Sequence, residues 1–314
     1  MKSAAFWISL AAVLGAGLVL TEMVSNEYYY NALYVILQAM LMAVAWNILG
    51  GFTGYVNFGV AGFFAVGAYT SVALHKAFSL PLPVTIVAAG LVCGLIGLGL
   101  GYLTLRLKGV YFAIATLAMA IVIETLVNNW SYVGGAKGYY MLTPDKHLWF
   151  GSYIQMLFML MLLMTLAAIA VSRMLSTSRI GRGLAAIRDD EVAAESSGVP
   201  TLKLKLISTT VMGVMMGMAG APFPYFVTFV DPLSAFSLLV AVNAIAMPMI
   251  GGSSHWLGPV IGAILVGSMQ EIVKVTISSE VNVLVVGVML VVFITLAPQG
   301  IVGVVRKHMR RRAQ

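Results

Sequence analysis

Apolar runs of about 17 to 22 residues recur along the whole chain, joined by shorter polar connections. A helix needs about 20 such residues to cross the ~30 Å hydrocarbon core of a bilayer. The chain is 61% hydrophobic and only 9% charged, whereas soluble domains are roughly one quarter charged. Strands of a transmembrane β-barrel would give alternating segments of about ten residues, and none occurs. We therefore predict an all-α, polytopic membrane helix bundle that forms a single domain over residues 1–314.

The apolar runs predict ten membrane spans. The first run follows Lys2 and imitates a secretory signal peptide, but no small-x-small cleavage site precedes Thr21 and Glu22. We therefore expect this run to remain as the first helix. The predicted spans cover residues 5–21, 30–49, 58–75, 83–105, 109–128, 153–172, 204–221, 235–250, 257–275 and 281–298.

Basic residues are distributed unequally between the two ends of these spans, and cytoplasmic loops carry the excess of lysine and arginine in membrane proteins. With the N-terminus inside, fourteen of the 18 basic residues fall on the inner side and four on the outer side. The inner set is Lys2, Arg106, Lys108, Arg173, Arg179, Arg182, Arg188, Lys203, Lys205, Arg306, Lys307, Arg310, Arg311 and Arg312, and the outer set is Lys76, Lys137, Lys146 and Lys274. This bias predicts cytoplasmic N- and C-termini, a cytoplasmic loop at 173–205 and an external loop at 129–152.

Glycines four residues apart lie inside three of the predicted spans. Such spacing lets the backbones of neighbouring helices approach closely, which drives helix association in a membrane. We therefore expect tight packing at these positions, within the bundle or against a second membrane subunit. The pairs are Gly90 and Gly94, Gly97 and Gly101, Gly213 and Gly217, and Gly258 and Gly262.

The most polar stretch of the chain lies at 173–205, between two apolar runs. Its acidic residues are Asp189, Asp190, Glu191 and Glu195, interleaved with Arg179, Arg182 and Arg188. Four apolar residues fall at i, i+4, i+7 and i+14, which places them along one face of a helix. They are Ile180, Leu184, Ile187 and Ala194. Gly198 and then Pro200 are typical of a helix end, so we predict a helix over 180–198.

Two interpretations of this helix remain open. The first is a solvated connector laced with ion pairs. The second is docking in a groove of another protein, which the mixed charge favours, since a helix that rests on anionic lipid is basic on its polar face. In that case Glu191 and Arg188 meet complementary groups of the partner, while Ile187 and Ala194 fill an apolar strip. Charge reversal at Glu191 is then expected to abolish function and to leave the protein inserted and stable.

Breaks in the apolar spans indicate a path through the membrane, because non-helical backbone at membrane depth is stable only inside protein or along a cavity. Pro222 follows the seventh span and Pro248 interrupts the eighth. Asn243 lies five residues before Pro248, where it either satisfies the carbonyl that proline frees or faces a polar lumen. The candidate path residues are Asn47, Asn57, Pro222, Asn243 and Pro248.

Motifs of several other protein classes are missing from the sequence. The chain has no GxxxxGK[ST] phosphate loop, its four histidines lack metal-ligand spacing, and its one cysteine lies in an apolar run. We therefore expect no enzyme activity, no bound metal or cofactor and, since the basic residues flank the spans, no nucleic acid. An ion-gradient-driven transporter is an alternative that needs acids inside the membrane. Glu124 and Glu271 are the candidates, although Lys274 stands three residues from Glu271 as a helical ion-pair partner.

Several sequence motifs follow one another between residues 30 and 303. They include GGFTGYVNFG at 50–59, LRLKGVYF at 105–112, SRIGR at 178–182, AIRDDE at 186–191 and PQGI at 298–301. In this order they resemble the LivM-type permeases of branched-chain amino acid ABC importers. The spacing Glu191-x-Ala193-Ala194-x-x-x-Gly198 also resembles the EAA loop of ABC importer permeases, the element that docks on the ATPase subunit.

The resemblance implies a permease subunit that forms half of a translocation path in the bacterial cytoplasmic (inner) membrane. It further implies a homologous LivH-like permease, two cytoplasmic ATPase subunits that bind ATP and Mg²⁺, and a periplasmic substrate-binding protein. The solute would be a branched-chain or other hydrophobic amino acid, although relatives on this scaffold carry urea, amides or aromatic acids. The candidate coupling residues are Ile180, Gly181, Leu184, Ile187, Arg188, Asp189, Glu191, Ala194, Glu195 and Gly198.

Overall fold

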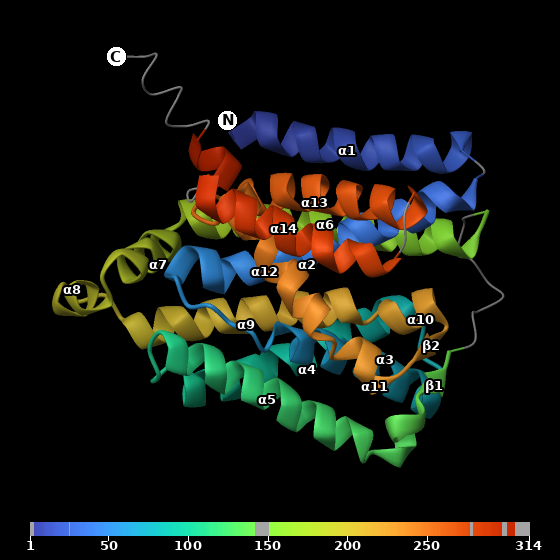
Figure 1. Ribbon diagram of the computed structural model, residues 1–314, viewed down its shortest axis with the longest axis horizontal. Coiled ribbons are helices and arrows are strands. Elements are labelled where there is room, and N and C mark those ends of the chain that lie inside the picture. Colours follow the sequence, from blue (N-terminus) through green and yellow to red (C-terminus); the bar gives the residue numbers. More distant parts are fainter. Residues whose placement is uncertain (1–2, 25, 142–150, 277–278, 297–299, 305–314) are drawn as a thin grey trace.

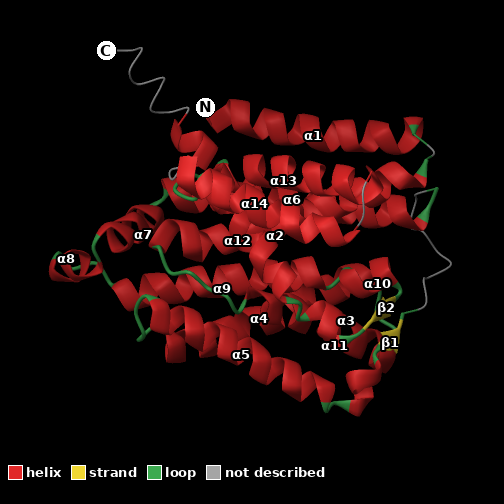
Figure 2. Cartoon of the chain, viewed as in Figure 1, coloured by secondary structure: helices red, strands yellow, loops and turns green. Residues whose placement is uncertain are grey.

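The computed structural model describes residues 3–24, 26–141, 151–276, 279–296 and 300–304. Its regular structure is almost entirely helical (Figure 2), and most of the long helices run side by side along the longest axis of the molecule (Figure 1). The long helices are α1 (Ser3–Met23), α2 (Glu27–Thr53), α3 (Val60–Phe78), α4 (Leu82–Thr104), α5 (Val110–Asn128), α6 (Tyr153–Thr177), α9 (Thr201–Gly220), α12 (Leu238–Gly251), α13 (Gly258–Thr276) and α14 (Ser279–Leu296). The short ones are η1 (Ser131–Val133), η2 (Gly135–Lys137), α7 (Arg179–Asp189), α8 (Glu191–Ser196), α10 (Phe223–Val227) and α11 (Pro232–Ala235).

The prediction of a polytopic helical bundle is confirmed. Each predicted span overlaps one of the long helices, and the eighth also takes in the end of α11. Residues 297–298, the end of the predicted tenth span, lie outside the described residues. Within the described part, eight helical stretches are long and apolar enough to cross a membrane. They cover residues 4–23, 27–53, 82–104, 110–128, 153–177, 201–227, 232–251 and 258–276.

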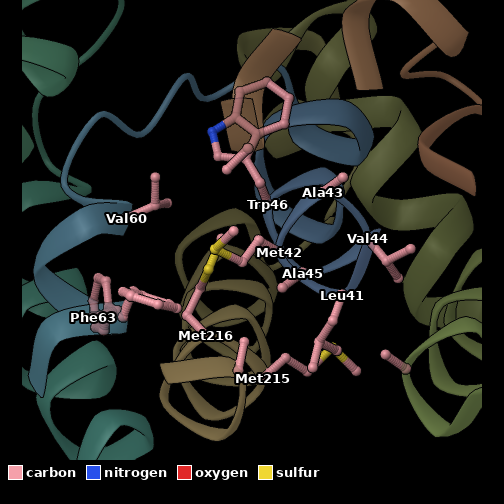
Figure 3. Close-up of a cluster of buried hydrophobic side chains, with 14 of the residues drawn as sticks. Leu41, Met42, Ala43, Val44, Ala45, Trp46, Val60, Phe63, Met215 and Met216 are labelled. Atoms are coloured by element: carbon pink, nitrogen blue, oxygen red, sulfur yellow. The ribbon is translucent and has the colours of Figure 1, made fainter. Parts of the chain in front are cut away.

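Helix α2 is central to the bundle and packs against α6, α9, α12 and α13. Every residue from Gln38 to Thr53 is buried, as expected for a helix that is apolar on all sides. Figure 3 shows side chains of α2 between Leu41 and Trp46 beside Met215 and Met216 of α9. Helices α1 and α5 lie at opposite margins of the view in Figure 1 and have few buried residues. Their outer faces are therefore available to lipid or to another membrane subunit.

The glycine pairs occupy helix crossings, as predicted. A Cβ atom added at Gly94 would lie 2.7 Å from Val214 Cγ2, and one at Gly217 would lie 2.6 Å from the Ala89 carbonyl oxygen. The backbones of α4 and α9 therefore meet where a larger residue has no room. A Cβ at Gly262 would overlap the carbonyl oxygen of Met247, so α12 and α13 cross in the same way.

Short elements occupy the two ends of the bundle. Helices α7 and α8 lie at the end where α1 begins, whereas η1, η2 and two strands lie at the opposite end (Figure 1). The strands β1 (Tyr139–Tyr140) and β2 (Phe229–Val230) pair in antiparallel orientation. Strands of two residues leave no alternating pattern, which is why the sequence did not indicate them. Of the predicted external loop, 142–150 lie outside the described residues, and the side of the membrane that each end faces stays a prediction.

Candidate functional site

The polar segment forms two short helices, α7 and α8, in place of the single helix predicted over 180–198. The chain turns at Asp190, whose backbone is extended with φ −160° and ψ 110°. Its carboxylate accepts hydrogen bonds from the backbone N–H groups of Val192 (2.9 Å) and Ala193 (3.0 Å). An aspartate that caps a new helix in this way competes with continuation of the old one. Helix periodicity does not reveal such a local competition.

The predicted end of the segment at Gly198 is confirmed. Gly198 has φ +82°, in the left-handed region that glycine tolerates. Its N–H donates to the carbonyl of Glu195 (2.9 Å), and the N–H of Val199 donates to the carbonyl of Ala194 (3.0 Å). This pair of bonds is the Schellman motif, which closes a helix and directs the chain away from it.

The apolar strip of the segment faces its own bundle, which differs from our expectation. Leu184, Ile187 and Ala194 are 0%, 3% and 5% exposed, because α7 packs against α2, α6 and α9. Gly181 is also buried and Ile180 half-buried. The expectation that Ile187 and Ala194 enter a groove of a partner is therefore corrected, since their contacts are already made within this chain.

Glu191 lies in a buried cluster with Lys205 and Tyr55. The ammonium Nζ of Lys205 donates to Glu191 Oε1 (2.8 Å), to Tyr55 Oη (3.1 Å) and to the carbonyl oxygen of Leu105 (3.1 Å). All three donors of the ammonium are thus satisfied. Tyr55 Oη in turn donates to Glu191 Oε2 (2.5 Å). The Lys205 side chain, at the start of α9, therefore connects that helix to α8, to the end of α4 and to the 54–59 connection.

The two charged side chains of this cluster are largely buried. The Lys205 side chain is 3% exposed and that of Glu191 is 14% exposed. A charge at that depth is tolerated only when it is paired and hydrogen-bonded. Sequence reasoning missed Lys205 and Tyr55, because nothing in the spacing links residues 14 and 136 positions away from Glu191. A signal was present in Lys205 itself, a lysine at the start of an apolar run.

Two opposing effects act on the pKa of the Glu191 carboxyl. Burial raises the pKa, but hydrogen bonds from Lys205 and Tyr55 and the nearby charges of Lys205 and Lys108 outweigh it, so the pKa lies below its usual range. The Glu191 carboxylate is therefore ionised at neutral pH. Because the folded-state pKa is lowered, the ionised Glu191 carboxylate stabilises the folded protein at pH values above the ordinary carboxyl range. This contribution to the free energy of unfolding is lost only as the pH falls below that range.

The outward surface of the segment carries mixed charge and one large apolar residue. Val192 is 63% exposed, and α7 and α8 also carry exposed charged residues of both signs. Arg188 and Asp189 form an ion pair at 3.4 Å, with 31% and 74% of the side chains exposed. We call this surface the docking face, after the docking interpretation of the sequence, which stays a prediction. Its exposed residues are Arg179, Arg182, Arg188, Asp189, Asp190, Val192, Ala193 and Glu195.

The candidate path residues have different surroundings in the structure. Asn57 Oδ1 accepts from the N–H of Gly59 (2.7 Å), whereas Asn243 Oδ1 accepts from Gln270 of α13 (3.1 Å). Asn47 is fully buried, and its amide atoms have no partner among the described residues. Pro222 precedes α10 and Pro248 lies inside α12, both buried. Asn243 Oδ1 accepts from Gln270, and among the described residues its side-chain N–H makes no hydrogen bond to the carbonyl that Pro248 frees.

One small cavity lies beside the Glu191 cluster, and Asn57 is the path candidate that lines it. The other lining residues include Thr104, Phe112, Thr116 and Thr209, from α4, α5 and α9. Its volume of about 20 Å³ gives room for roughly one water molecule. An amino acid therefore cannot occupy the cavity in this conformation, and the other four candidates do not line it.

The two membrane acids differ in their surroundings. Glu271 forms the predicted ion pair with Lys274 at 3.9 Å along α13. Glu124 is half-buried on α5, the helix at the margin of the bundle. These placements do not form an acid chain across the described part of the bundle, the arrangement that a proton or ion relay uses.

Comparison with known proteins places this architecture in a family. The family model described as "Branched-chain amino acid transport system / permease component" matches residues 28–294, which run from α2 into α14. The chain belongs to this permease family. Helix α1 lies before the matched region, and the docking face lies inside it. The resemblance inferred from the sequence motifs is thereby confirmed.

Curated members of the family match this permease over most of its length. The high-affinity branched-chain amino acid transport permease LivM of Salmonella typhimurium is 26% identical over 300 residues, covering 87% of this chain and 70% of LivM. LivM of Escherichia coli K12 is 26% identical over 296 residues, covering 86% and 69%. The probable permease LivH of Methanocaldococcus jannaschii is 25% identical over 289 residues, covering 87% and 90%. No solved structure matches at a significant level.

Proposed function

We propose that this permease is one membrane subunit of an ATP-driven importer of branched-chain or other hydrophobic amino acids. The observation that carries the proposal is the docking face, a capped pair of helices at one end of a membrane bundle with both charge signs and Val192 exposed. Such a surface suits a groove on a protein better than anionic lipid, which would repel its acids. The chain carries no phosphate-binding loop, so the ATPase is a separate partner.

The complete assembly in this proposal contains five chains. This permease and a LivH-like permease enclose the translocation path, two ATPase subunits bind ATP and Mg²⁺ on the cytoplasmic side, and a periplasmic protein captures the solute. LivM and LivH relatives both match the chain at family level, which supports a pair of related permeases. Asn57 is the path residue that the structure favours most, because it lines the cavity.

Co-purification tests this function most simply. A tagged permease extracted in mild detergent from its native membrane should retain an ATPase in stoichiometric amount, and Val192→Asp should lose it. Extraction of the wild-type permease without any ATPase, under conditions that keep the two permeases together, would contradict the proposal. In that case an ion-gradient-driven transporter becomes the better description.

The orientation of the permease gives a second test. We expect the docking face and both termini in the cytoplasm of a bacterium and the β1–β2 end in the periplasm, from the excess of basic residues on the docking side. Cysteine at Tyr139 should react with an impermeant thiol reagent added to spheroplasts, and cysteine at Ser178 should react only after lysis. Cys93 is buried, so it stays unreactive in either case. External labelling at position 178 with protection at 139 would show that the permease has the opposite orientation.

A further inference from the structure

The Glu191 cluster lies between the docking face and the small cavity, and each of its contacts leads to the cavity wall. The ring of Tyr55 meets the ring of Phe112 edge-on, with centroids 5.1 Å apart, and Phe112 lines the cavity. Tyr55 also stands two residues before Asn57, another lining residue. Tyr55, which is hydrogen-bonded to Glu191 of α8, therefore joins α8 to the 54–59 connection and to α5.

The remaining two contacts of the cluster lead to α4 and α9. The carbonyl of Leu105, which accepts from Lys205, directly follows Thr104 of the lining. The backbone carbonyl of Lys205 accepts from Thr209 Oγ1 (3.0 Å) one turn further along α9, and Thr209 also lines the cavity. Lys205 thus touches, directly or through one neighbour, three helices that form the wall.

The 54–59 connection is itself held firmly against the bundle. Trp46 Nε1 of α2 donates to the carbonyl of Asn57 (3.0 Å), and the N–H of Phe58 donates to Thr116 Oγ1 of α5 (3.2 Å). The 54–59 connection is therefore fixed both to α2 and to Thr116 of the cavity wall.

We propose that the cluster of Glu191, Lys205 and Tyr55 transmits movement of α8 to the wall of the cavity lined by Asn57, Thr104, Phe112 and Thr209. The inference rests on the proposed function and assigns these three as positioning residues for coupling. The ammonium of Lys205 is shielded from water and has three acceptors, so a displaced α8 carries its partners along. The exposed pair of Arg188 and Asp189 lacks this property, because water competes for both charges.

The test separates transmission from folding and from docking. Glu191→Gln with Lys205→Met removes both charges together, which leaves no unpaired ion and is commonly tolerated in a fold. We expect this double variant to accumulate, to retain the ATPase and to hydrolyse ATP, while the solute transported per ATP falls at least tenfold. A merely structural pair would change the amount of protein and leave that ratio unaltered.

A matched control uses a different ion pair of the described residues, formed between neighbours on one helix. Glu271→Gln with Lys274→Met neutralises a pair on α13 that is remote from the docking face, and the transport ratio should stay at the wild-type value. Tyr55→Phe deletes one hydroxyl, keeps the ion pair and should lower the ratio severalfold. If the double variant does not accumulate, the ratio measured with Tyr55→Phe tests the inference.

A wild-type ratio of solute to ATP in the double variant, or in Tyr55→Phe when that variant alone is available, would overturn the inference. Failure of the proposed function looks different. There the wild-type permease itself retains no ATPase, and this is established before any variant is made.

Discussion

Replacing Glu191 by lysine should remove most of the permease from the membrane. The substitution leaves the ammonium of Lys205, 3% exposed, without its carboxylate and adds a second positive charge beside it. Removing one partner of a buried pair costs about 3–5 kcal/mol, whereas the whole free energy of unfolding of a protein is about 5–15 kcal/mol. We expect the inserted protein to fall several-fold on immunoblots and the Tm of the remainder to fall. The structure thus reverses the expectation, drawn from sequence, that this variant stays inserted and stable.

Glu195→Lys is the matched control for that prediction. Glu195 is in the same helix, is exposed and accepts a hydrogen bond from Thr201 Oγ1 (2.9 Å). Charge reversal at an exposed position changes stability by less than about 1 kcal/mol, so the protein level should match that of the wild type. Normal accumulation of Glu191→Lys would show that the carboxylate faces water and that the cluster does not form.

Val192→Asp should abolish uptake and leave the permease folded. Val192 is 63% exposed in the chain, and substitutions on such a surface cost the fold about 0.5 kcal/mol or less. In a complex with the ATPase, however, the new carboxylate would be buried without a partner, which costs a few kcal/mol. Since each 1.4 kcal/mol is tenfold in affinity, we expect ATPase binding to weaken by about 100-fold. Uptake of labelled solute and pull-down of the ATPase measure the two effects.

Two controls show whether the effect of Val192→Asp comes from lost ATPase binding and not from misfolding. Val192→Leu keeps the residue apolar and should retain uptake and ATPase binding. The protein level and Tm of Val192→Asp should equal those of the wild type, in contrast to Glu191→Lys. Tight ATPase binding by Val192→Asp would show that the partner binds elsewhere on the chain.

Sequence reasoning predicts the fold well, because membrane solvation imposes simple rules. Apolar runs of span length and the absence of water for backbone groups leave little besides a helical bundle. The glycine pairs predict close crossings for a similar reason, since Gly94 and Gly217 leave space that no other residue leaves. The turn at Gly198 follows from its left-handed backbone. Each of these features can be read from one residue type or from one run of apolar residues, without knowledge of contacts that are distant in sequence.

The candidate site is predicted less well, because its chemistry depends on contacts distant in sequence. Periodicity places Ile187 and Ala194 on one face but does not say whether the chain itself or a partner covers it. The pairing of Glu191 with Lys205 and Tyr55 requires the folded arrangement of α8, α9 and the 54–59 connection. Likewise Asn243 has Gln270 as its partner, from a helix that spacing alone does not bring next to it.

We propose that ATP, and not an ion gradient, drives uptake through this permease. The direct measurement uses proteoliposomes that contain the permease pair and the ATPase subunits, with binding protein and labelled solute outside and ATP–Mg²⁺ inside. We predict uptake of a branched-chain amino acid that requires internal ATP, persists when ion gradients are collapsed, and is lost with Val192→Asp. Uptake that proceeds without ATP, follows an imposed proton or sodium gradient and survives Val192→Asp would contradict the account.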